Sequence, residues 1–220
     1  AEETKDSVIT ELDDQSTKVT LLRRAFLREA MQGKQVKQNP NDEPASELLK
    51  KIKAEKEKLI KEKKLKKDKP LPEINPEEIP FEIPSTWEWC RLGEICNNIT
   101  KGSSPKWQGV KYIDSPENGM LFITSKNVDS FKIDLSNVTY VEERFNEIEP
   151  RSILKKGDLL TNIVGASIGR TALYDLDDVA NINQAVCLLR IEHTLIDKRF
   201  LLYTMNSDFV INLMFASQFA

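Results

Sequence analysis

Residues 156–170 read KGDLLTNIVGASIGR, and this stretch does most to decide the fold. Gly157-Asp158 is a turn-forming pair, and the apolar run after it has the length of a buried strand. Gly165 and Gly169 then predict a hairpin-like reversal, because the residues that follow, RTALY, again have a strand pattern. The stretch therefore predicts two neighbouring strands joined by a glycine-spaced turn.

The same glycines raise the question of a nucleotide site. A Walker A loop requires GxxxxGK[ST], and the segment from Gly165 to Arg170 has neither the lysine nor the hydroxyl that would hold Mg²⁺. A Rossmann loop requires GxGxxG at the start of a helix, whereas Gly165 and Gly169 are followed by a strand pattern. Two uses stay open: a purely structural reversal, or a turn whose amides, Ser167 and Arg170 contact a phosphate or a base edge.

Outward from this stretch, the body of the chain alternates short apolar runs with turns. Strands are expected at Met120–Thr124, Val138–Tyr140, Asp158–Val164, Gly169–Tyr174 and Ala185–Ile191. A short helix is expected over Arg91–Asn98, and a closing helix from about Asp197 to Phe219. The pattern predicts an α+β (mixed α/β) fold: a compact domain with a twisted, largely antiparallel sheet and flanking helices, preceded by a helical region.

The first 70 residues have helical periodicity. Helices are expected at about residues 16–33 and 44–67, because apolar side chains recur there at steps of three and four. Between Lys50 and Lys69, eleven lysines face only four acids. Three interpretations of this run stay open: a solvated helix face, contact with a phosphate backbone, or docking on an acidic protein partner.

A proline-rich connector separates the helical region from the body. The five prolines from Pro70 to Pro84 exclude a helix or a central strand. Apolar residues between them indicate that the connector lies against the body, and Trp87 and Trp89 are expected to pack it there. The expected organisation is a helical region at 1–70, a connector at 71–84 and a domain at 85–220 that ends in a helix.

Composition excludes several classes of protein. The net charge of −3 divides unevenly, since residues 1–70 hold 18 Lys/Arg and 14 Asp/Glu whereas residues 71–220 hold 14 and 21, so a basic surface must be local. The spacing of Cys90 and Cys96 is not that of zinc ligands, and His193 is the only histidine. A single histidine leaves little room for a Ser/His or Cys/His nucleophilic pair, and no cofactor loop is visible. We therefore expect no catalytic residue, metal or cofactor, and a cytoplasmic location, since the N-terminus has no secretory apolar segment.

Three polar loops suggest a binding protein. The most basic is Ile99–Tyr112, ITKGSSPKWQGVKY, which combines lysines, hydroxyls and a glutamine with the flat aromatic side chains of Trp107 and Tyr112. That mixture suits contact with phosphates and base edges, although it is equally typical of a mobile solvent loop. The loops TSKNVD at Thr124–Asp129 and NINQAV at Asn181–Val186 have the same two interpretations.

The ordered motifs resemble one family. LRRAFLREAMQGKQVKQNPNDEPASELLKKIKAEKEKLIKEKKLKKDKPLPEI, EIPFEIPSTWEWCRLGEI, TKGSSPKW, FITSKNV, LKKGDLLTNIVGASIGR and NINQAVCLLRI together resemble the specificity subunit of type I restriction–modification enzymes. The resemblance implies a non-catalytic subunit in which two target recognition domains each read one half of a split DNA sequence. It also implies partners: a modification (methyltransferase) subunit that brings S-adenosylmethionine, and a motor–nuclease restriction subunit. Only one recognition domain is present, so we expect a half-subunit, and pairing of two copies as a homodimer stays open.

Candidate residues follow from the loops and the helix faces. The candidate double-stranded DNA contacts are Lys101, Ser103, Ser104, Lys106, Trp107, Gln108, Lys111, Lys126, Asn127, Ser167 and Arg170. The candidate partner-docking residues are Leu22, Phe26, Leu48, Ile52 and Leu59. The sequence predicts a half-site reader that directs methylation and cleavage by its partners. The alternative is a helical scaffold that docks a methyltransferase subunit and binds little DNA itself.

Overall fold

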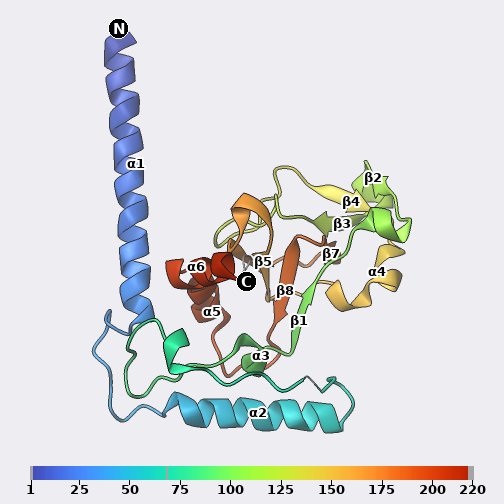
Figure 1. Ribbon diagram of the computed structural model, residues 1–220. Coiled ribbons are helices and arrows are strands. Elements are labelled where there is room, and N and C mark those ends of the chain that lie inside the picture. The colour runs from blue at the N-terminus through green and yellow to red at the C-terminus, as the bar shows by residue number, and fades with distance from the viewer. Residues whose placement is uncertain (1, 68, 218–220) are drawn as a thin grey trace.

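The computed structural model describes residues 2–67 and 69–217, which form an α+β body with one long helix standing away from it (Figure 1). Its α-helices are α1 (Glu2–Met31), α2 (Ala45–Lys61), α3 (Leu92–Ile95), α4 (Phe145–Ile148), α5 (Lys198–Met205) and α6 (Asp208–Ala216). Its strands are β1 (Asn98–Lys101), β2 (Tyr112–Ile113), β3 (Met120–Ile123), β4 (Thr139–Val141), β5 (Asp158–Asn162), β6 (Thr171–Tyr174), β7 (Ala180–Ile182) and β8 (Val186–Arg190).

The strands form two four-stranded sheets. In the first sheet, the order β1-β8-β5-β6 is antiparallel throughout, and β5 and β6 are the hairpin predicted from the glycine-spaced turn. In the second sheet, the order is β2-β4-β3-β7, and the β3–β7 pair is parallel. The expected mixed α+β, largely antiparallel fold is confirmed, but the strands divide between two sheets where one was expected.

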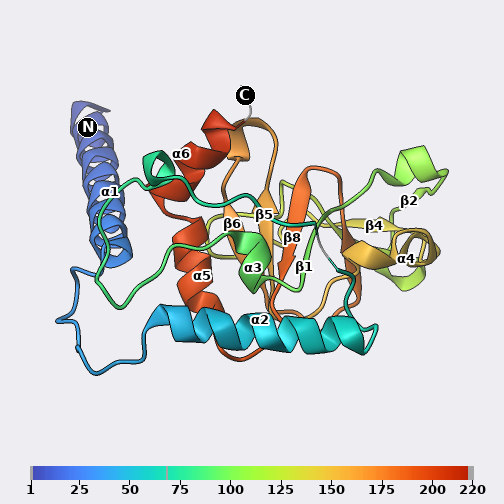
Figure 2. The ribbon, with the colours of Figure 1, turned by 60° about the horizontal axis from the view of Figure 1, so that its bottom comes forward.

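Two of the three apolar clusters among the described residues join the sheets to each other and to the helices. One lies between the sheets and includes Ile123, Leu160 and Ile182. The other joins the outer face of the first sheet to α2 and α5, and there Ile52 of α2 packs with Leu159 of β5. Figure 2 shows α2 lying across the body below α3. Because α2 shares a core with the sheet, it is fixed to the body, while most of its lysines face solvent.

The helices differ from the expected ranges in ways that the contacts explain. α1 begins at Glu2, well before residue 16, and α2 ends at Lys61. The closing helix is interrupted, because the side-chain amide of Asn206 bonds the backbone N–H and carbonyl of Thr171, and Ser207 then caps α6. Tertiary bonds to β6 thus divide one apolar pattern into α5 and α6.

The proline-rich connector packs on the body through aromatic rings, as the sequence predicts. Phe81 contacts both Trp89 and Phe209 of α6 edge to face, with ring centroids 5.2 and 5.6 Å apart. Trp87 contacts Phe200 of α5 in the same geometry. In the part of the chain that the structure describes, no helix has both the length and the apolarity needed to cross a bilayer.

Candidate nucleic-acid interface

Four loops gather at one edge of the two sheets. β1 and β5 end there while β8 and β6 begin there, and the parallel pair β3 and β7 ends at the same edge. The loops are therefore residues 102–111, 124–138, 163–170 and 183–185. We call this surface the loop edge. It lies at the end of the body away from α2 (Figure 1).

Backbone bonds and close contacts tie these loops to one another. The N–H of Gly102 donates to the carbonyl of Val186, and the N–H of Asn183 donates to that of Ile123. The buried amide of Asn162 donates to the carbonyls of Ser125 and Val128. The loop edge is consequently one connected surface, assembled from segments as far apart in the sequence as Gly102 and Ala185.

Gly102 is required by close packing. A Cβ atom at this position would lie 2.0 Å from the carbonyl oxygen of Ile182 and 2.5 Å from that of Asn183. Real side-chain atoms do not approach backbone oxygen so closely, so only glycine lets the 102–111 loop start against the β7–β8 turn.

The C-terminal end of the 102–111 loop is held by hydrogen bonds to two charged side chains, Glu142 and Arg144. The backbone N–H of Lys111 donates to the Glu142 carboxylate at 2.9 Å, and Arg144 bonds both that carboxylate and the carbonyl of Gly109. The bond from Lys111, followed by the one from Arg144, lowers the pKa of Glu142. The loop is thus fixed at both ends, and its tip projects from a rigid base.

The tip of this loop presents polar and aromatic side chains to solvent. Trp107, in the 3-10 turn Pro105–Gln108, is 77% exposed. Lys101, Lys106 and Lys111 are exposed around it, and none of the three has an ion pair among the described residues. Flat rings and unpaired lysines are the groups that stack on bases and contact phosphates.

Two candidates in this loop need correction. Ser104 is buried and precedes the 3-10 turn, with its carbonyl accepting the N–H of Trp107, so its place is in the loop's framework. The amide nitrogen of Gln108 already donates to Glu149 at 3.0 Å and to Ser103 at 3.3 Å. Only the amide oxygen of Gln108 therefore stays available as an acceptor.

The second group of candidates lies on the neighbouring loops. Lys126 is exposed, and Ser167 ends the short 3-10 turn that follows β5. Arg170 is about half exposed and lies 3.6 Å from the Asp129 carboxylate. An exposed pair of this kind is worth little in water, so Arg170 is free to exchange Asp129 for a phosphate.

The prediction that Asn127 contacts DNA also needs correction. Its side chain is 2% exposed, its oxygen accepts from the backbone and hydroxyl of Thr124, and its nitrogen donates to the carbonyls of Asp134 and Asn137. These four bonds leave the amide nothing to offer a base, because an amide has two donors and two acceptor sites. Asn127 shapes the 124–138 loop from below.

Sequence reasoning did not nominate Gln184, although it singled out the loop that contains it. Gln184 is exposed in the β7–β8 turn, between the 102–111 loop and the 163–170 loop. Its amide has no hydrogen bond among the described residues. The pairing of β7 with β3 and the bare Gly102 place it there, and neither can be recognised from local sequence.

The partner-docking candidates divide between surface and core. Leu22 and Phe26 of α1 are more than half exposed. Ile52 is 1% exposed and belongs to the α2–sheet core, and Leu48 packs against the same cluster. Leu59 is partly buried. The expectation that the apolar side of α2 docks a partner is therefore corrected for Ile52 and Leu48, because that side already stabilises the body.

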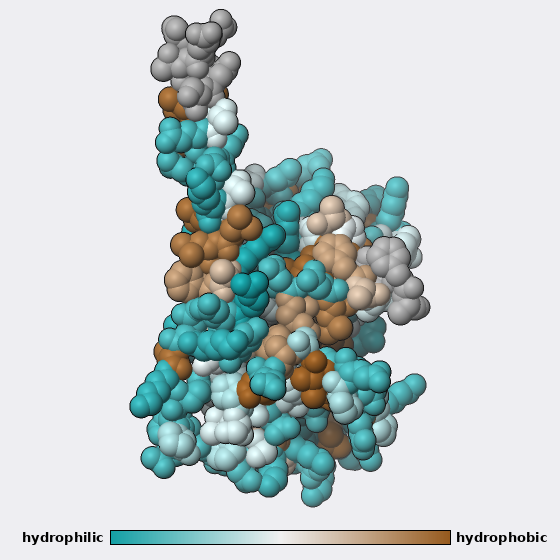
Figure 3. All heavy atoms as spheres, turned by 60° about the vertical axis from the view of Figure 1, so that its left-hand side comes forward, coloured by the Kyte–Doolittle hydropathy of each residue, from teal (hydrophilic) through white to brown (hydrophobic). Residues whose placement is uncertain are grey.

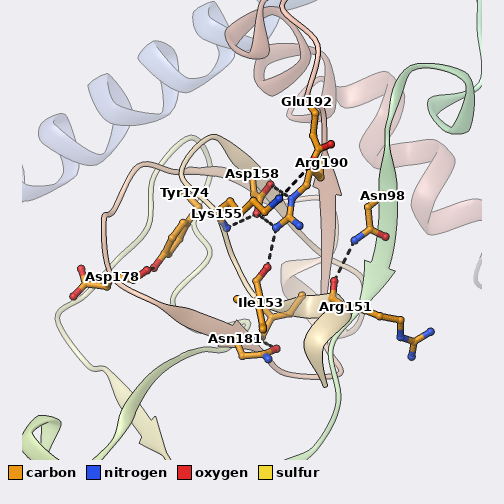
Figure 4. Close-up of polar contacts among 11 residues, drawn as sticks. Asn98, Arg151, Ile153, Lys155, Asp158, Tyr174, Asp178, Asn181, Arg190 and Glu192 are labelled. Carbon is orange, nitrogen blue, oxygen red and sulfur yellow. Dashed lines mark hydrogen bonds and ion pairs between the residues drawn. The ribbon is translucent and has the colours of Figure 1, made fainter. Parts of the chain in front are cut away.

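At the opposite edge of the first sheet, a buried ion pair joins β5 to β8. Figure 4 shows Asp158 accepting from Arg190 at 2.6 and 2.8 Å and from the backbone N–H of Lys155 at 2.7 Å. Arg190 also donates to the carbonyl of Ile153. Both side chains are nearly buried and are bonded to each other and to nearby backbone groups, which indicates a structural role for the pair.

The cysteines are likewise part of the core. Burial raises the pKa of Cys96 to about 12 and the pKa values of Cys90 and Cys187 to about 11. All three are therefore protonated near neutral pH and behave as apolar side chains. Within the described ranges, no group of three or more His, Cys, Asp or Glu side chains could hold a metal ion.

The curated proteins that the chain resembles are specificity subunits of type I restriction enzymes. The chain is 54% identical over 87 residues to the EcoEI type I restriction enzyme specificity subunit of Escherichia coli, a match that covers 40% of this chain and 15% of that protein. It is 61% identical over 79 residues to the EcoAI specificity subunit of the same organism, covering 36% and 13%. It is 31% identical over 132 residues to the MjaVIII specificity subunit of Methanocaldococcus jannaschii, covering 58% and 30%. The chain thus matches less than a third of each of these relatives.

Solved structures give weaker likenesses, and no family model matches the chain. The crystal structure of the HsdS subunit from Thermoanaerobacter tengcongensis superposes with a TM-score of 0.45 at 16% identity, covering 91% of this chain and 42% of that one. A chain of a type I R-M system superposes with a TM-score of 0.43 at 20% identity, covering 90% and 39%. TM-scores this low add no support to the relationship with specificity subunits that the sequence identities indicate.

Proposed function

We propose that this chain, a relative of the specificity subunits of type I restriction enzymes, recognises one half of a split double-stranded DNA sequence. The single observation that supports this role most strongly is the loop edge, where four loops rich in amides, hydroxyls and lysines form one connected surface on a rigid base. Hydrogen-bonding side chains on fixed loops can read base edges without any catalytic group. In this proposal, residues 85–220 are the target recognition domain, residues 71–84 the connector and residues 1–70 a helical region.

Within the loop edge, we assign different tasks to different side chains. Phosphate contacts fall to the exposed lysines and to one arginine, namely Lys101, Lys106, Lys111, Lys126 and Arg170. Base contacts fall to Ser103, Gln108, Ser167 and Gln184, with Trp107 as the flat surface that meets a base or sugar. Phosphate contacts set position and affinity, whereas the amides and hydroxyls set the sequence preference.

The chain works with partners in this proposal. It is non-catalytic and binds no cofactor, and it directs methylation by a modification (methyltransferase) subunit and cleavage by a motor–nuclease restriction subunit, in the cytoplasm. The exposed Leu22 and Phe26 on α1 are the surface offered for assembly, since large apolar side chains in water favour a protein partner.

Two experiments test the proposal. Selection of bound duplexes from a randomised DNA library should enrich one short motif with the purified chain, and Gln184→Ala should relax the preference at one position while leaving non-specific binding unchanged. Mapping of methylated sites, after co-expression with a cognate modification subunit, should find the same motif as one half of a split site.

The alternative of a helical scaffold predicts the opposite pattern. In that case the chain would still bind the modification subunit, but no motif would be enriched and variants at the loop edge would leave the methylated sites unchanged. Such a result would refute the DNA-reading role, and Leu22→Asp would then be the variant that abolishes complex formation.

A further inference from the structure

A carboxylate of the loop edge faces an arginine. Asp129, in the 124–138 loop, lies 3.6 Å from the guanidinium of Arg170, and both side chains are about half exposed. Among the described residues, the other partner of this carboxylate is the backbone N–H of Ser130, at 2.8 Å. Asp129 therefore places a negative charge on the surface assigned to DNA, and Arg170 is the cation that neutralises it.

The turn at residues 129–132, which carries this carboxylate, has a fixed shape. The N–H of Asp129 donates to the carbonyl of Lys132 at 3.1 Å, and Val128 pairs with Ile133 in an isolated antiparallel bridge. Phe131 has a φ of +72°, a left-handed conformation that a bulky residue adopts only where its surroundings impose it. The carboxylate is thus presented from a rigid turn.

Contacts with the body impose that conformation. The N–H of Phe131 donates at 2.8 Å to the carbonyl of Thr171, the residue directly after Arg170, and its ring packs on Tyr203 of α5 with centroids 5.4 Å apart. The turn also lines a cleft of about 1230 Å³ between the body and α1, and Figure 3 shows apolar side chains gathered on the lower part of α1, next to this cleft. Because one bond joins the turn to the start of β6, Asp129 and Arg170 keep their relative position.

A bound duplex changes the electrostatics of this pair. A phosphate attracts Arg170 strongly, and the exposed pair with Asp129 contributes little in water, so Arg170 exchanges one partner for the other. The Asp129 carboxylate then lies against DNA without its cation. A carboxylate in that position loses water and is repelled by the phosphates, unless a group on the DNA donates a hydrogen bond to it.

The base edges offer a suitable donor. In the major groove, cytosine presents its N4 amino group, which donates to a carboxylate. Adenine also has an amino group there, but the neighbouring N7 is an acceptor that repels a carboxylate, and guanine and thymine present only acceptors to it. Cytosine is therefore the base that best satisfies an unpaired aspartate.

We propose that Asp129 is a specificity-determining residue, whose carboxylate accepts a hydrogen bond from the N4 amino group of one cytosine in the half-site and repels duplexes that lack this donor. The inference rests on the proposed DNA-reading role and adds one base to it. Arg170 holds the carboxylate in the free chain and releases it when a phosphate arrives. Asp129 then discriminates by the cost it imposes on wrong sequences as well as by the bond it makes with the right one.

Asp129→Asn is the test, because it removes the charge and keeps the size of the side chain. In selection from a randomised duplex library, the preference for cytosine at one position of the motif should fall about 10-fold. In fluorescence anisotropy, the affinity for duplexes of random sequence should rise about 2-fold or more, because the repulsion is lost. A purely structural role would instead weaken the binding of every duplex.

Two further variants serve as controls. Asp177→Asn removes the same charge from an exposed acid that pairs with Lys156 at 3.1 Å, beyond the end of β6 at the opposite edge of the first sheet. It should leave both the motif and the affinity for random duplexes unchanged. Asp129→Glu keeps the charge but moves the carboxylate by one methylene, so the cytosine preference should fall while the affinity for random duplexes stays the same.

The outcomes separate this inference from the function on which it rests. A chain that enriches no motif refutes the DNA-reading role and the inference with it. A motif that Asp129→Asn leaves unchanged refutes the inference alone. The inference also fails if Asp129→Asn weakens all duplexes equally, or if Asp177→Asn strengthens the binding of random duplexes as much as Asp129→Asn does.

Discussion

Removing three lysines from the loop edge should reduce the salt dependence of DNA binding by a calculable amount. The perturbation is the triple variant Lys101→Gln, Lys106→Gln and Lys126→Gln. These side chains are exposed and, among the residues that the structure describes, form no ion pair. Glutamine is polar and uncharged, and the three positions are exposed, so the change removes charge with little effect on packing.

The magnitude follows from counterion release. Each phosphate neutralised on duplex DNA contributes a slope of about 0.9 to the dependence of log K on log salt, so losing three contacts should reduce the slope by about 2.7. Between about 50 mM and about 200 mM salt, that slope corresponds to a change in affinity of about 40-fold. Fluorescence anisotropy with a labelled duplex, titrated at several salt concentrations, measures the slope directly.

The matched control removes the same charge from α2. Lys53, Lys58 and Lys61 are exposed on that helix, at the end of the body away from the loop edge. Their replacement by glutamine should leave the slope unchanged. If the α2 triple variant lowers the slope and the loop-edge variant does not, the DNA lies along the lysine-rich helix and the assignment of the loop edge is refuted.

Further predictions concern the support of this surface. Ile52→Ala should lower the free energy of unfolding by about 2–5 kcal/mol in urea titrations, because Ile52 fills the α2–sheet core; a cost below about 1 kcal/mol would show that α2 is only loosely attached. Arg190→Met should cost about 3–5 kcal/mol by leaving the Asp158 carboxylate buried and unpaired, and adding Asp158→Leu should recover much of this loss. Asn127→Ala should destabilise the chain without altering the selected DNA motif, whereas a changed motif would restore Asn127 as a base reader. Burial raises the pKa of Cys96 to about 12, so the thiol stays protonated in the folded chain and a thiol reagent at pH 8 should modify Cys96 only upon unfolding. Because the unfolded thiol has the ordinary pKa of 9.0, the stabilisation that comes from burying Cys96 in its protonated form is fully present below pH 9 and is lost as the pH rises toward 12.

The sequence predicts the strands that are long and apolar, and it does so for a physical reason. β5, β6 and β8 are largely buried on both faces, and each carries neighbouring apolar residues, such as Leu159-Leu160 in β5 and Leu188-Leu189 in β8, that mark it as a strand. β1 and β7 are three or four residues long and include Asn98 and Asn181, so their local signal is that of a loop. Their strand character comes from pairing with distant partners, which local sequence does not record.

The candidate site divides in the same way. The composition of the 102–111 loop is enough to identify an exposed, basic surface, and Trp107 and the lysines do lie in solvent. Composition cannot distinguish an amide that faces solvent from one that is bonded within the loop. The sequence therefore nominates Asn127, whose amide is bonded inside the loop, and omits Gln184, whose amide is exposed. The distinction depends on where the carbonyls of other segments lie.

The bare backbone at Gly102 sets the boundaries within which this protein could be retargeted. Since no side chain fits between Gly102 and the β7–β8 turn, and Glu142 clamps the other end at Lys111, a grafted segment can replace the exposed residues 106–109 while both junctions stay in place. Pro105 and Val110 on either side are buried and would be kept, so the insert itself stays outside the core. New specificities could then be exchanged as cassettes, at little cost to the stability of the scaffold that carries them.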